Sequence, residues 1–378
     1  MRILFLIDNL RPGGAQKALL AIATALKSSG SEPTVWCLGG SSEIEQAFTA
    51  RGIPVLGRPS SVWRTLAQPL ALARFLQREK IDVLQTFLFH SDVAGRIAGR
   101  LAKGIRRRNR PCVVGSVRAS NLRNRWWQFL LARATARWAD AFSSVSWRSL
   151  QFAAEHEGVD LERARVIPNG IDLASWKTPP RDVARRLLDV LPDDFVVATV
   201  GRLHAQKGYK HLLRAAVEVL RKQPNALFLI AGYGPLRKKL EARTQRLRIA
   251  RRVRFLGYRK DVETLLAASD LFVLPSLWEG MSNAILEAMA AARPVVATAV
   301  DGNVEQVSEG ETGLLVPPAD APALAGAILR LARDPVSAER MGRAGRRRAE
   351  ELFSLERMTS AYLDFYAELL KGPAGRPS

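Results

Sequence analysis

VIPNGIDLASWKTPP, residues 166–180, divides the sequence into two halves with the same pattern. Its Asn-Gly and Pro-Pro pairs favour turns, so the stretch predicts a linker between two domains. On both sides of it, short apolar runs alternate with longer amphipathic stretches, which is typical of strands and helices that alternate in parallel sheets. A chain of 378 residues is also too long for one typical core. The sequence therefore predicts an α/β protein with two doubly wound, Rossmann-like domains.

Thirteen apolar runs are the expected strands of these two parallel sheets. Before the linker they are ILFLID (3–8), PTVWCL (33–38), IPVL (53–56), DVLQTFLF (82–89), CVVGSV (112–117), AFSSVS (141–146) and ARVIP (164–168). After the linker they are FVVATVG (195–201), ALFLIAG (226–232), VRFLG (253–257), LFVLPS (271–276), PVVATAV (294–300) and GLLVP (313–317). Folds of this kind bind ligands at the carboxyl ends of the strands, so we expect the two domains to face a central cleft.

The expected domain boundaries follow from the linker and from the end of the second set of strands. The first domain is expected to span residues 1–172 and the second residues 173–352. Residues 353–378 begin with an amphipathic stretch, FSLERMTSAYLDFYAELL, which predicts a helix that packs back toward the first domain.

The composition predicts a cytoplasmic protein without membrane spans. No run approaches the roughly 18–20 apolar residues that cross a bilayer. MRILFLID, residues 1–8, is expected to be a buried strand because its apolar stretch is short and lacks a small-residue cleavage site. Cys37 and Cys112 lie in strand-like runs without metal-ligand spacing, so we expect buried free thiols, as in a reducing compartment.

Positive charge is concentrated in one part of the chain. The net charge is +21, from 57 basic and 36 acidic residues. Between positions 96 and 148 the only acidic residue is Asp140. The basic residues of that stretch are Arg96, Arg100, Lys103, Arg106, Arg107, Arg108, Arg110, Arg118, Arg123, Arg125, Arg133, Arg137 and Arg148. We expect this face to meet a polyanion or an anionic surface.

Aromatic residues are interleaved with the arginines in residues 106–138. They are Trp126, Trp127, Phe129 and Trp138. Aromatic and leucine bulk beside cations suits a helix that is partly buried in an anionic membrane surface. The alternative is a core helix with a solvated basic face.

Two strand-to-helix loops have the residues to hold a phosphate. In DNLRPGGAQKALL (8–20), Gly13 and Gly14 open a helix, where glycine lets a ligand approach the backbone and free amides favour an anion. The alternative is a plain turn, because the GxGxxG fingerprint is absent. In TVGRLHAQKGYKHLL (199–213), Arg202 and Lys207 stand at a helix entrance and can clamp a diphosphate. The alternative for these two is a pair of solvated cations.

WEGMSNAILEAM, residues 278–289, holds two glutamates eight positions apart. We expect a helix to begin near Ser282, so that Glu279 precedes it and Glu287 lies inside it on the face of Asn283. Backbone amides at the start of this helix are expected to face the cleft. They belong to Gly280, Met281, Ser282, Asn283 and Ala284. A carboxylate on such an apolar helix needs a partner, which is either a structural salt bridge or hydrogen bond or the hydroxyl pair of a ligand.

Together these motifs resemble the retaining nucleotide-sugar glycosyltransferases of family 4, which have the two-domain GT-B fold. The resemblance covers essentially the whole chain. Its motifs are the glycine pair after the first strand, PNGID at the linker, GYGPL, VRFLG, the E-x7-E pair and TGLLVPP. The second-domain motifs are highly specific in this order, whereas those of the first domain are weaker.

The resemblance implies roles for the matching residues of the second domain. Arg202 and Lys207, with Gly201 beside them, would hold the donor diphosphate. Glu279 would contact the transferred sugar together with the amides of residues 280–283. Glu287 would receive the ribose hydroxyls of the donor.

Three further positions are matched with less specificity. His90 falls where similar enzymes carry a histidine beside the donor sugar, although a lone histidine is usually structural. Asn169 matches the Asn-Gly motif of the linker, and a turn explains it about as well. Asp301 stands where the family often has the first of two glycines, so we expect Asp301 to reshape the sugar pocket and the identity of the donor sugar not to carry over.

The implied enzyme moves a sugar from a UDP- or GDP-sugar to a glycan or to a polyprenyl- or lipid-linked acceptor, with retention of configuration, at the inner face of the cytoplasmic membrane. It is expected to need no cofactor. No Asp-x-Asp sequence occurs in the chain, so we also expect no metal, with Arg202 and Lys207 neutralising the leaving phosphate.

Three other interpretations account for parts of the sequence. A phosphorylase-like GT-B protein would use a pyridoxal-phosphate lysine, for which we find no position. A basic nucleic-acid-binding protein would explain the charge, but the recognised RNA motifs are missing, so no nucleic-acid partner is expected. A catalytically silent scaffold of the same fold would tolerate Glu279→Ala.

Overall fold

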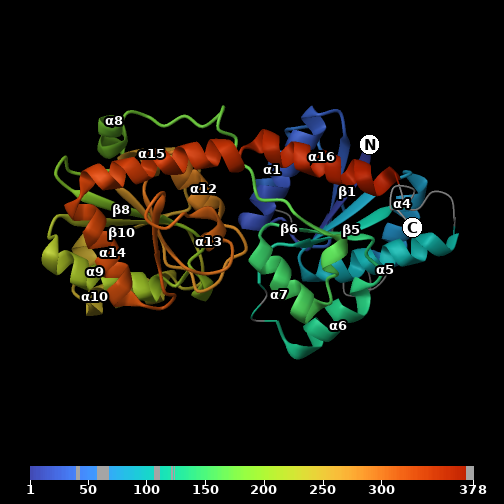
Figure 1. Cartoon of the computed structure of the whole chain (residues 1–378), viewed down its shortest axis with the longest axis horizontal. Coiled ribbons are helices and arrows are strands. Elements are labelled where there is room, and N and C mark those ends of the chain that lie inside the picture. The colour runs from blue at the N-terminus through green and yellow to red at the C-terminus, as the bar shows by residue number, and fades with distance from the viewer. Residues whose placement is uncertain (40–42, 58–67, 106–110, 121, 123, 372–378) are drawn as a thin grey trace. The chain divides into compact units, whose positions relative to one another are not determined.

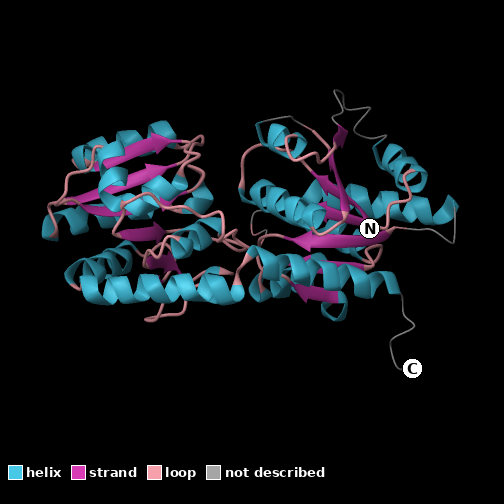
Figure 2. Cartoon of the chain, turned by 90° about the horizontal axis from the view of Figure 1, so that it is seen from above, coloured by secondary structure: helices cyan, strands magenta, loops and turns pink. Residues whose placement is uncertain are grey.

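The chain forms two units, each built around its own parallel sheet (Figures 1 and 2). The structure is a computed structural model, and it describes residues 1–39, 43–57, 68–105, 111–120, 122 and 124–371. Unit 1 consists of Met1–Gly170 with Leu355–Ser378, and unit 2 of Ile171–Ser354. The chain therefore leaves unit 1 after Gly170 and returns to it after Ser354, where the expected boundaries were residues 172 and 352.

The sheet of unit 1 has seven strands in the order β3-β2-β1-β4-β5-β6-β7. The strands are β1 (Arg2–Ile7), β2 (Glu32–Cys37), β3 (Val55–Gly57), β4 (Val83–Phe87), β5 (Cys112–Val117), β6 (Ala141–Ser144) and β7 (Ala164–Val166). All neighbouring strands are parallel. The order reverses direction between β1 and β4, which makes the carboxyl ends of these two strands the topological switch point of the unit.

Helices cover both faces of this sheet (Figure 2). They are α1 (Gly14–Ser28), α2 (Glu43–Thr49), α4 (Gln68–Arg78), α5 (Phe89–Ile105), α6 (Trp126–Ala136), α7 (Trp147–Glu157), the 3₁₀ turn η1 (Leu161–Arg163) and α16 (Leu355–Lys371). Strand β1 supplies both faces because its side chains alternate. Ile3, Phe5 and Ile7 lie in the core on the side of α1 and α16, whereas Leu4 and Leu6 lie in the core beside α4 and α5.

Helix α16 completes the core of unit 1 although it lies far from that unit in sequence. Tyr362, Phe365 and Tyr366 are buried in the same cluster as β1. The Tyr366 hydroxyl donates a hydrogen bond to Oε1 of Gln85, a fully buried residue of β4. Burial raises the pKa of Tyr366, so its hydroxyl remains a donor.

The sheet of unit 2 has six strands in the order β10-β9-β8-β11-β12-β13. The strands are β8 (Phe195–Val200), β9 (Ala226–Ala231), β10 (Val253–Gly257), β11 (Leu271–Leu274), β12 (Val295–Thr298) and β13 (Gly313–Val316). They are also parallel throughout. The switch point of this unit lies between β8 and β11, in the position that β1 and β4 occupy in unit 1.

The helices of unit 2 again lie on both faces of its sheet (Figure 2). They are α8 (Arg181–Leu187), η2 (Ala205–Lys207), α9 (Tyr209–Lys222), α10 (Arg237–Arg246), η3 (Ala250–Arg252), α11 (Val262–Ala268), α12 (Asn283–Ala290), α13 (Asn303–Gln306), α14 (Ala321–Arg333) and α15 (Pro335–Leu352). Val197 of β8 packs in the core with α9 and α14, and Val196 and Ala198 pack in the core with α8 and α11.

The structure confirms the fold class that the sequence predicts. Each of the thirteen apolar runs overlaps one strand, and the two sheets are doubly wound. The strand boundaries differ by at most two residues from the expected ones, because the last residues of several runs turn away from the sheet toward the following helix. No helix among the described residues combines the length and the apolar character needed to span a bilayer.

Candidate functional site

The loops that follow β8 and β11 lie against each other at the switch point of unit 2. Gly208, which has a positive φ of 60°, permits this approach, because a Cβ there would lie 1.9 Å from the carbonyl oxygen of Pro275. Two hydrogen bonds join the loops: the Leu277 N–H donates to the Gln206 oxygen at 2.7 Å, and Gln206 Nε2 donates to the Trp278 oxygen at 3.0 Å. The loop before α9 and the loop before α12 are therefore packed and hydrogen-bonded together.

Lys207 and Glu279 form a buried ion pair within this structure. The side chain of Glu279 is only 7% exposed and that of Lys207 14%. The carboxylate of Glu279 also accepts a hydrogen bond from Ser276 Oγ at 2.6 Å, and its backbone N–H donates to Asp301 Oδ2 at 2.8 Å. Lys207 and Ser276 thus hold the carboxylate of Glu279, and Asp301 holds its backbone.

Arg202 differs from Lys207 in its surroundings. It follows Gly201 directly after β8 and is exposed, and no other residue in the described part of the chain pairs with its guanidinium group. The turn beneath it is fixed by Tyr209, whose hydroxyl donates to the Gly201 oxygen at 3.0 Å. Burial raises the pKa of Tyr209, so this donor keeps its proton.

Helix α12 begins at the same edge of the sheet, one residue after Ser282. Both backbone groups of Ser282 are held by the amide of Gln306, which accepts from the N–H at 2.8 Å and donates to the carbonyl at 2.9 Å. The first N–H groups of a helix have no partner inside it, so Asn283 and Ala284 present amides at a fixed helix start. Glu287 follows Asn283 by one turn, as expected, and is half-buried.

Asp301 and Gly302, after β12, complete this arrangement. Asp301 has a positive φ of 36°, which is uncommon for a residue other than glycine. Gly302 lies directly under Gly280, because a Cβ at position 302 would be 1.9 Å from the Gly280 oxygen. The loop from Trp278 to Gly280 is therefore held at two points. Asp301 binds the backbone N–H of Glu279, and Gly302 packs against the backbone of Gly280.

In unit 1, Gly13 and Gly14 occupy the start of α1. Gly13 has an extended backbone and is the cap residue of the helix, and a Cβ on it would lie 2.6 Å from Gln16 Oε1. Beside Gly14 there is open space within 4 Å of the position that a Cβ would take. A Cβ at Gly13 would thus require the end of the flexible Gln16 side chain to move, whereas Gly14 has room for one.

His90 is the second residue of α5, at the switch point of unit 1, and is held by Asp8. His90 Nδ1 lies 2.9 Å from Asp8 Oδ2, and the N–H and hydroxyl of Ser91 both donate to Asp8 Oδ1 at 2.7 Å. The His90 side chain is 68% exposed, whereas that of Asp8 is 15% exposed. The hydrogen bond to Asp8 raises the pKa of His90, against a smaller opposite effect of burial.

Asn169 is buried and has a structural partner. Its Oδ1 accepts a hydrogen bond from Arg118 Nη2 at 2.6 Å, and the guanidinium group of Arg118 lies over the ring of Phe87, 5.4 Å from its centroid. Burial lowers the pKa of Arg118. Arg118 was expected on a basic surface, but its side chain is half-buried and is held by Phe87 and Asn169.

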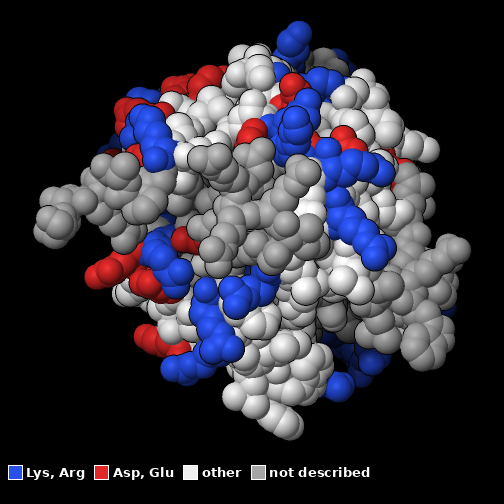
Figure 3. Space-filling model, turned by 90° about the vertical axis from the view of Figure 1, so that its right-hand side faces the viewer, with Lys and Arg blue, Asp and Glu red and all other residues white. Residues whose placement is uncertain are grey.

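Arg96 is also inside the protein, contrary to the expected basic surface. It is buried, donates to the Ala132 oxygen at 3.2 Å, and lies over the ring of Phe142. Arg100, Arg125, Arg133, Arg137 and Arg148 are exposed. Arg106, Arg107, Arg108, Arg110 and Arg123 lie outside the described residues, as does the side chain of Lys103. On the face shown in Figure 3, the described Lys and Arg side chains occur in several groups.

The aromatic residues of α6 divide between the surface and the interior. Trp126 is 74% exposed, and Trp127, Leu130 and Leu131 are exposed beside it. Phe129 faces inward, with its ring centroid 6.3 Å from that of Phe152, and Trp138 is half-buried. Helix α6 therefore presents apolar side chains next to exposed arginines.

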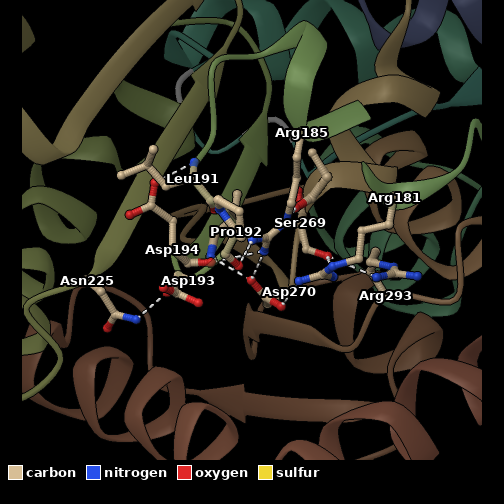
Figure 4. A network of polar contacts seen from close by, with 12 residues as sticks. Arg181, Arg185, Leu191, Pro192, Asp193, Asp194, Asn225, Ser269, Asp270 and Arg293 are labelled. Carbon is tan, nitrogen blue, oxygen red and sulfur yellow. Dashed lines mark hydrogen bonds and ion pairs between the residues drawn. The ribbon is translucent and has the colours of Figure 1, made fainter. Parts of the chain in front are cut away.

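Several arginines of unit 2 form ion pairs and hydrogen bonds at the amino ends of its strands (Figure 4). Asp270 forms ion pairs with Arg181 and Arg185 and accepts the Val196 N–H at 2.7 Å. The buried Arg185 also donates to the backbone oxygens of Pro192 and Asp194, at 2.7 and 3.0 Å. Part of the +21 charge is thus structural.

Sequence reasoning missed three residues of these sites, namely Asp8, Ser276 and Gln306. Asp8 was counted only as the end of a strand. However, it directly follows β1, and the corresponding position in unit 2 is the loop after β8 that holds Arg202. This equivalence could have identified Asp8 from the sequence. Ser276 and Gln306 carry no such signal, because their contacts depend on how three loops pack.

Two family descriptions match the chain, one on each side of the linker. Residues 12–175 match "Glycosyltransferase Family 4", and residues 194–334 match "Glycosyl transferases group 1". The matches include the loops that hold Gly13, His90, Lys207 and Glu279.

Individual proteins are similar over half of the chain or more. The UDP-Gal:alpha-D-GlcNAc-diphosphoundecaprenol alpha-1,3-galactosyltransferase of Escherichia coli is 30% identical over 308 residues, which are 78% of this chain and 77% of that enzyme. The lipopolysaccharide core biosynthesis glycosyltransferase LpsD of Rhizobium meliloti (strain 1021) is 35% identical over 50% of this chain and 54% of its own length. Anabaena HepE, solved in complex with UDP, has a TM-score of 0.85 and 25% identity, covering 97% of this chain and 100% of HepE.

Proposed function

The chain belongs to glycosyltransferase family 4, and from this premise we propose that it transfers a sugar from a UDP- or GDP-sugar, with retention of configuration, to a lipid-linked glycan acceptor. A UDP-sugar is the first choice, because HepE was solved with UDP and also with UDP-glucose. A lipid-linked acceptor is favoured by the name of the Escherichia coli enzyme, whose acceptor carries diphosphoundecaprenol.

The observation that carries this proposal is the buried Lys207–Glu279 pair beside the start of α12. Breaking the bond between a sugar and a nucleoside diphosphate builds negative charge on the leaving phosphate. A fixed ammonium group, an exposed guanidinium group at Arg202 and the first amides of α12 are suited to bind that charge. Because they are in place before the reaction, they stabilise the transition state more than the ground state.

We assign the binding of the transferred sugar and of the ribose to Glu279 and Glu287. Glu279 is immobilised by Lys207 and by Ser276, so its carboxylate can accept hydroxyl groups of the transferred sugar at a fixed point. Glu287, one turn into α12, is assigned to the ribose hydroxyls. In the proposed front-face attack, an oxygen of the donor phosphate takes the acceptor's proton, so no residue of the chain acts as nucleophile.

We further propose that this reaction needs no metal. An Asp-x-Asp pair is the usual source of metal ligands in enzymes that neutralise the diphosphate with a cation, and the sequence has none. Arg202 and Lys207 then supply the positive charge themselves.

The deciding experiment is a panel of UDP- and GDP-sugars presented to the purified protein. We expect one of them to bind and to be slowly hydrolysed, in the presence of EDTA as well as without it. Glu279→Ala should abolish hydrolysis, and the control Glu311→Ala, at an exposed position, should retain it. The proposal is abandoned if no sugar nucleotide binds, and a variant Glu279→Ala that keeps its activity would point to a scaffold without catalysis.

For the acceptor we propose that α6 rests on an anionic membrane. Its exposed Trp126, Trp127 and Leu130 lie beside exposed arginines, as a helix at a membrane interface requires. Flotation with vesicles that contain about one third phosphatidylglycerol tests this, at low and at high salt. Trp126→Ser with Trp127→Ser should reduce flotation, and Leu187→Ser, at an exposed leucine of α8, should not. Equal flotation of all three proteins would contradict the proposal.

A further inference from the structure

The two units place polar residues at equivalent points of their sheets. In unit 2 the switch point holds Lys207 after β8 and Glu279 after β11, and these two side chains form a pair. In unit 1 the strands in the same positions are β1 and β4, and the residues that follow them are Asp8 and His90. These also form a pair, with Nδ1 of His90 2.9 Å from Oδ2 of Asp8.

We propose that Asp8 is a positioning residue for His90: it holds the Nδ1–H of the imidazole and thereby presents Nε2 to a hydroxyl group of a substrate. This proposal rests on the proposed glycosyl transfer, and it adds to it a residue and a defined orientation of the ring.

The chemistry of the pair determines which ring nitrogen faces a substrate. An ionised carboxylate only accepts hydrogen bonds, so the nitrogen that contacts Asp8 must carry the proton. In the neutral ring, Nε2 is then an acceptor for a substrate hydroxyl, and in the imidazolium it is a donor. Among the described residues, Nε2 of His90 has no hydrogen-bond partner, and the side chain is mostly exposed.

The surroundings of Asp8 make it suited to this role. Its side chain is mostly buried, and its two oxygens are assigned to different tasks: Oδ2 contacts His90, and Oδ1 accepts the N–H and the hydroxyl of Ser91. The carboxylate therefore does not rotate freely. The ring of Phe89 packs edge-on against the imidazole, with the centroids 5.2 Å apart, and further limits its orientation.

Asp8 is also the group that sets the charge of His90. Its hydrogen bond and its negative charge both raise the pKa of His90, whereas burial lowers that pKa. Two residues from His90, Asp92 is bound to Thr86, and the charges of Arg96 of α5, Glu157 of α7 and Asp8 act on Asp92. Removing the charge of Asp8 should therefore lower the pKa of His90.

The alternative interpretation is that Asp8 has only a structural role. The bonds to Ser91 also fix the start of α5, and losing them would disturb the whole edge of the sheet. Two controls isolate this effect. Ser91→Ala removes one bond to Oδ1 and leaves His90 untouched, and Asp82→Asn removes the same charge at the other end of β1, where Asp82 accepts the Arg2 N–H at 2.7 Å.

The first experiment measures the pKa of His90 by NMR of the imidazole resonances, assigned with a His90→Gln variant. Asp8→Asn should lower this pKa, because the hydrogen bond and the charge of Asp8 that raise it are lost, while Asp82→Asn and Ser91→Ala should leave it close to the wild-type value. An unchanged pKa in Asp8→Asn would overturn the proposal. This readout needs no substrate, so it stands apart from the test of the glycosyl transfer.

The second experiment is a double-mutant cycle on the transfer reaction with the donor that the panel identifies. Asp8→Asn should lower kcat by about tenfold or more, with the KM for the donor changed by less than about twofold. In the His90→Gln background the same substitution should have an effect of less than about twofold, because the group it positions is absent. If the effects of Asp8→Asn and His90→Gln add fully, Asp8 is structural and the proposal fails. Failure of the proposed function would instead show as inactivity of the unmodified protein with every donor.

Discussion

The ammonium group of Lys207 has two roles. It neutralises the buried carboxylate of Glu279, and in the proposed reaction it also meets the leaving phosphate. A buried carboxylate that loses its cation is costly, so the two residues are expected to depend on each other. Substitution of either residue should therefore affect both the stability of the loops and the rate of transfer.

Lys207→Met is predicted to lower kcat by about 100- to 1,000-fold, because a preorganised charge at the leaving group is lost. Steady-state kinetics with the identified donor measure this effect. Lys222→Met serves as the control, since it removes only an exposed pair with Glu218 on α9, and it should leave kcat unchanged. A loss of less than about threefold in Lys207→Met would mean that Lys207 is only a structural partner of Glu279.

Asp92 gives the protein a predictable dependence on pH. Burial raises the pKa of Asp92 to about 6, although Arg96 and the hydrogen bond from Thr86 act in the opposite direction. The folded state then holds this proton more tightly than the unfolded chain, so the contribution of Asp92 to stability is greatest below about pH 4 and is lost as the pH rises to about 6. Asp92→Asn cannot ionise. Relative to the unmodified protein, this variant should gain up to about 3 kcal/mol between about pH 4 and pH 7 in urea unfolding. The same difference in stability at both pH values would contradict the assignment.

Which residues matter could be predicted from the sequence, but which of them pair could not. Lys207 and Glu279 were both expected at the site, yet with separate ligands, because nothing in the sequence shows that Gly208 lets their loops approach each other. Arg118 was expected on the surface, since an arginine in a basic stretch gives no local sign of burial. Its position depends on Phe87 and Asn169, which are distant in the sequence.

At the scale of elements, the start of α12 depends on a contact between two loops. Gly302 is the point of closest approach, because its backbone packs directly on the Gly280 oxygen. The loop from Trp278 to Gly280 then reaches α12 in a single arrangement. In the sequence, Asp301 and Gly302 stand where similar enzymes often have two glycines. The structure explains why the second of these positions, Gly302, is glycine.

Gly302→Ala is predicted to weaken both the fold of unit 2 and donor binding. Its Cβ would lie 1.9 Å from the Gly280 oxygen, so the backbone must shift, which costs about 1–3 kcal/mol. Thermal unfolding and donor titration measure the two effects. Gly326→Ala, inside α14 with open space around the new methyl group, should be neutral or slightly stabilising. A Gly302→Ala variant that binds the donor as before would show that the loop tolerates displacement.

The strands were the most predictable elements, and the helix contacts were the least. Each parallel strand is a short apolar run between turns, so the local sequence is enough to locate it. Helix α16 also has a clear amphipathic pattern, but this pattern does not show which surface the helix packs against. The fully buried Gln85, which receives the Tyr366 hydroxyl, is the specific partner that only the structure reveals.

At the scale of the whole molecule, unit 2 is a continuous segment inserted into unit 1. The two crossings of the chain lie next to each other, because Ile171 pairs with Ser354 and its N–H donates to the Phe353 oxygen at 2.8 Å. On the other side of the crossings, the Gly170 N–H contacts Met358 Sδ at 3.1 Å. Unit 2 is therefore complete without α16, whereas unit 1 is not.

A chain shortened to end at Ser354 is predicted to lose the fold of unit 1 and to keep that of unit 2. The truncation removes Tyr362 and Tyr366 from the core of unit 1, and each large core side chain contributes about 3–5 kcal/mol out of a total stability of about 5–15 kcal/mol. Hydrogen exchange, resolved by peptide, should show rapid exchange in β1 and β4 and protection in β8 and β11. The control Glu368→Ala removes only an exposed ion pair with Arg165 and should change neither unit. Retained protection of β1 in the truncated chain would contradict this prediction.

The insertion also sets an order for folding during protein synthesis. A ribosome completes unit 2 before it makes α16, so the domain that begins the chain is the one that must wait for its last core residues. During that interval the apolar face of β1 that α16 covers has no final partner. A chaperone that binds apolar strands is therefore expected to associate with nascent chains halted after unit 2 and to leave once α16 has emerged.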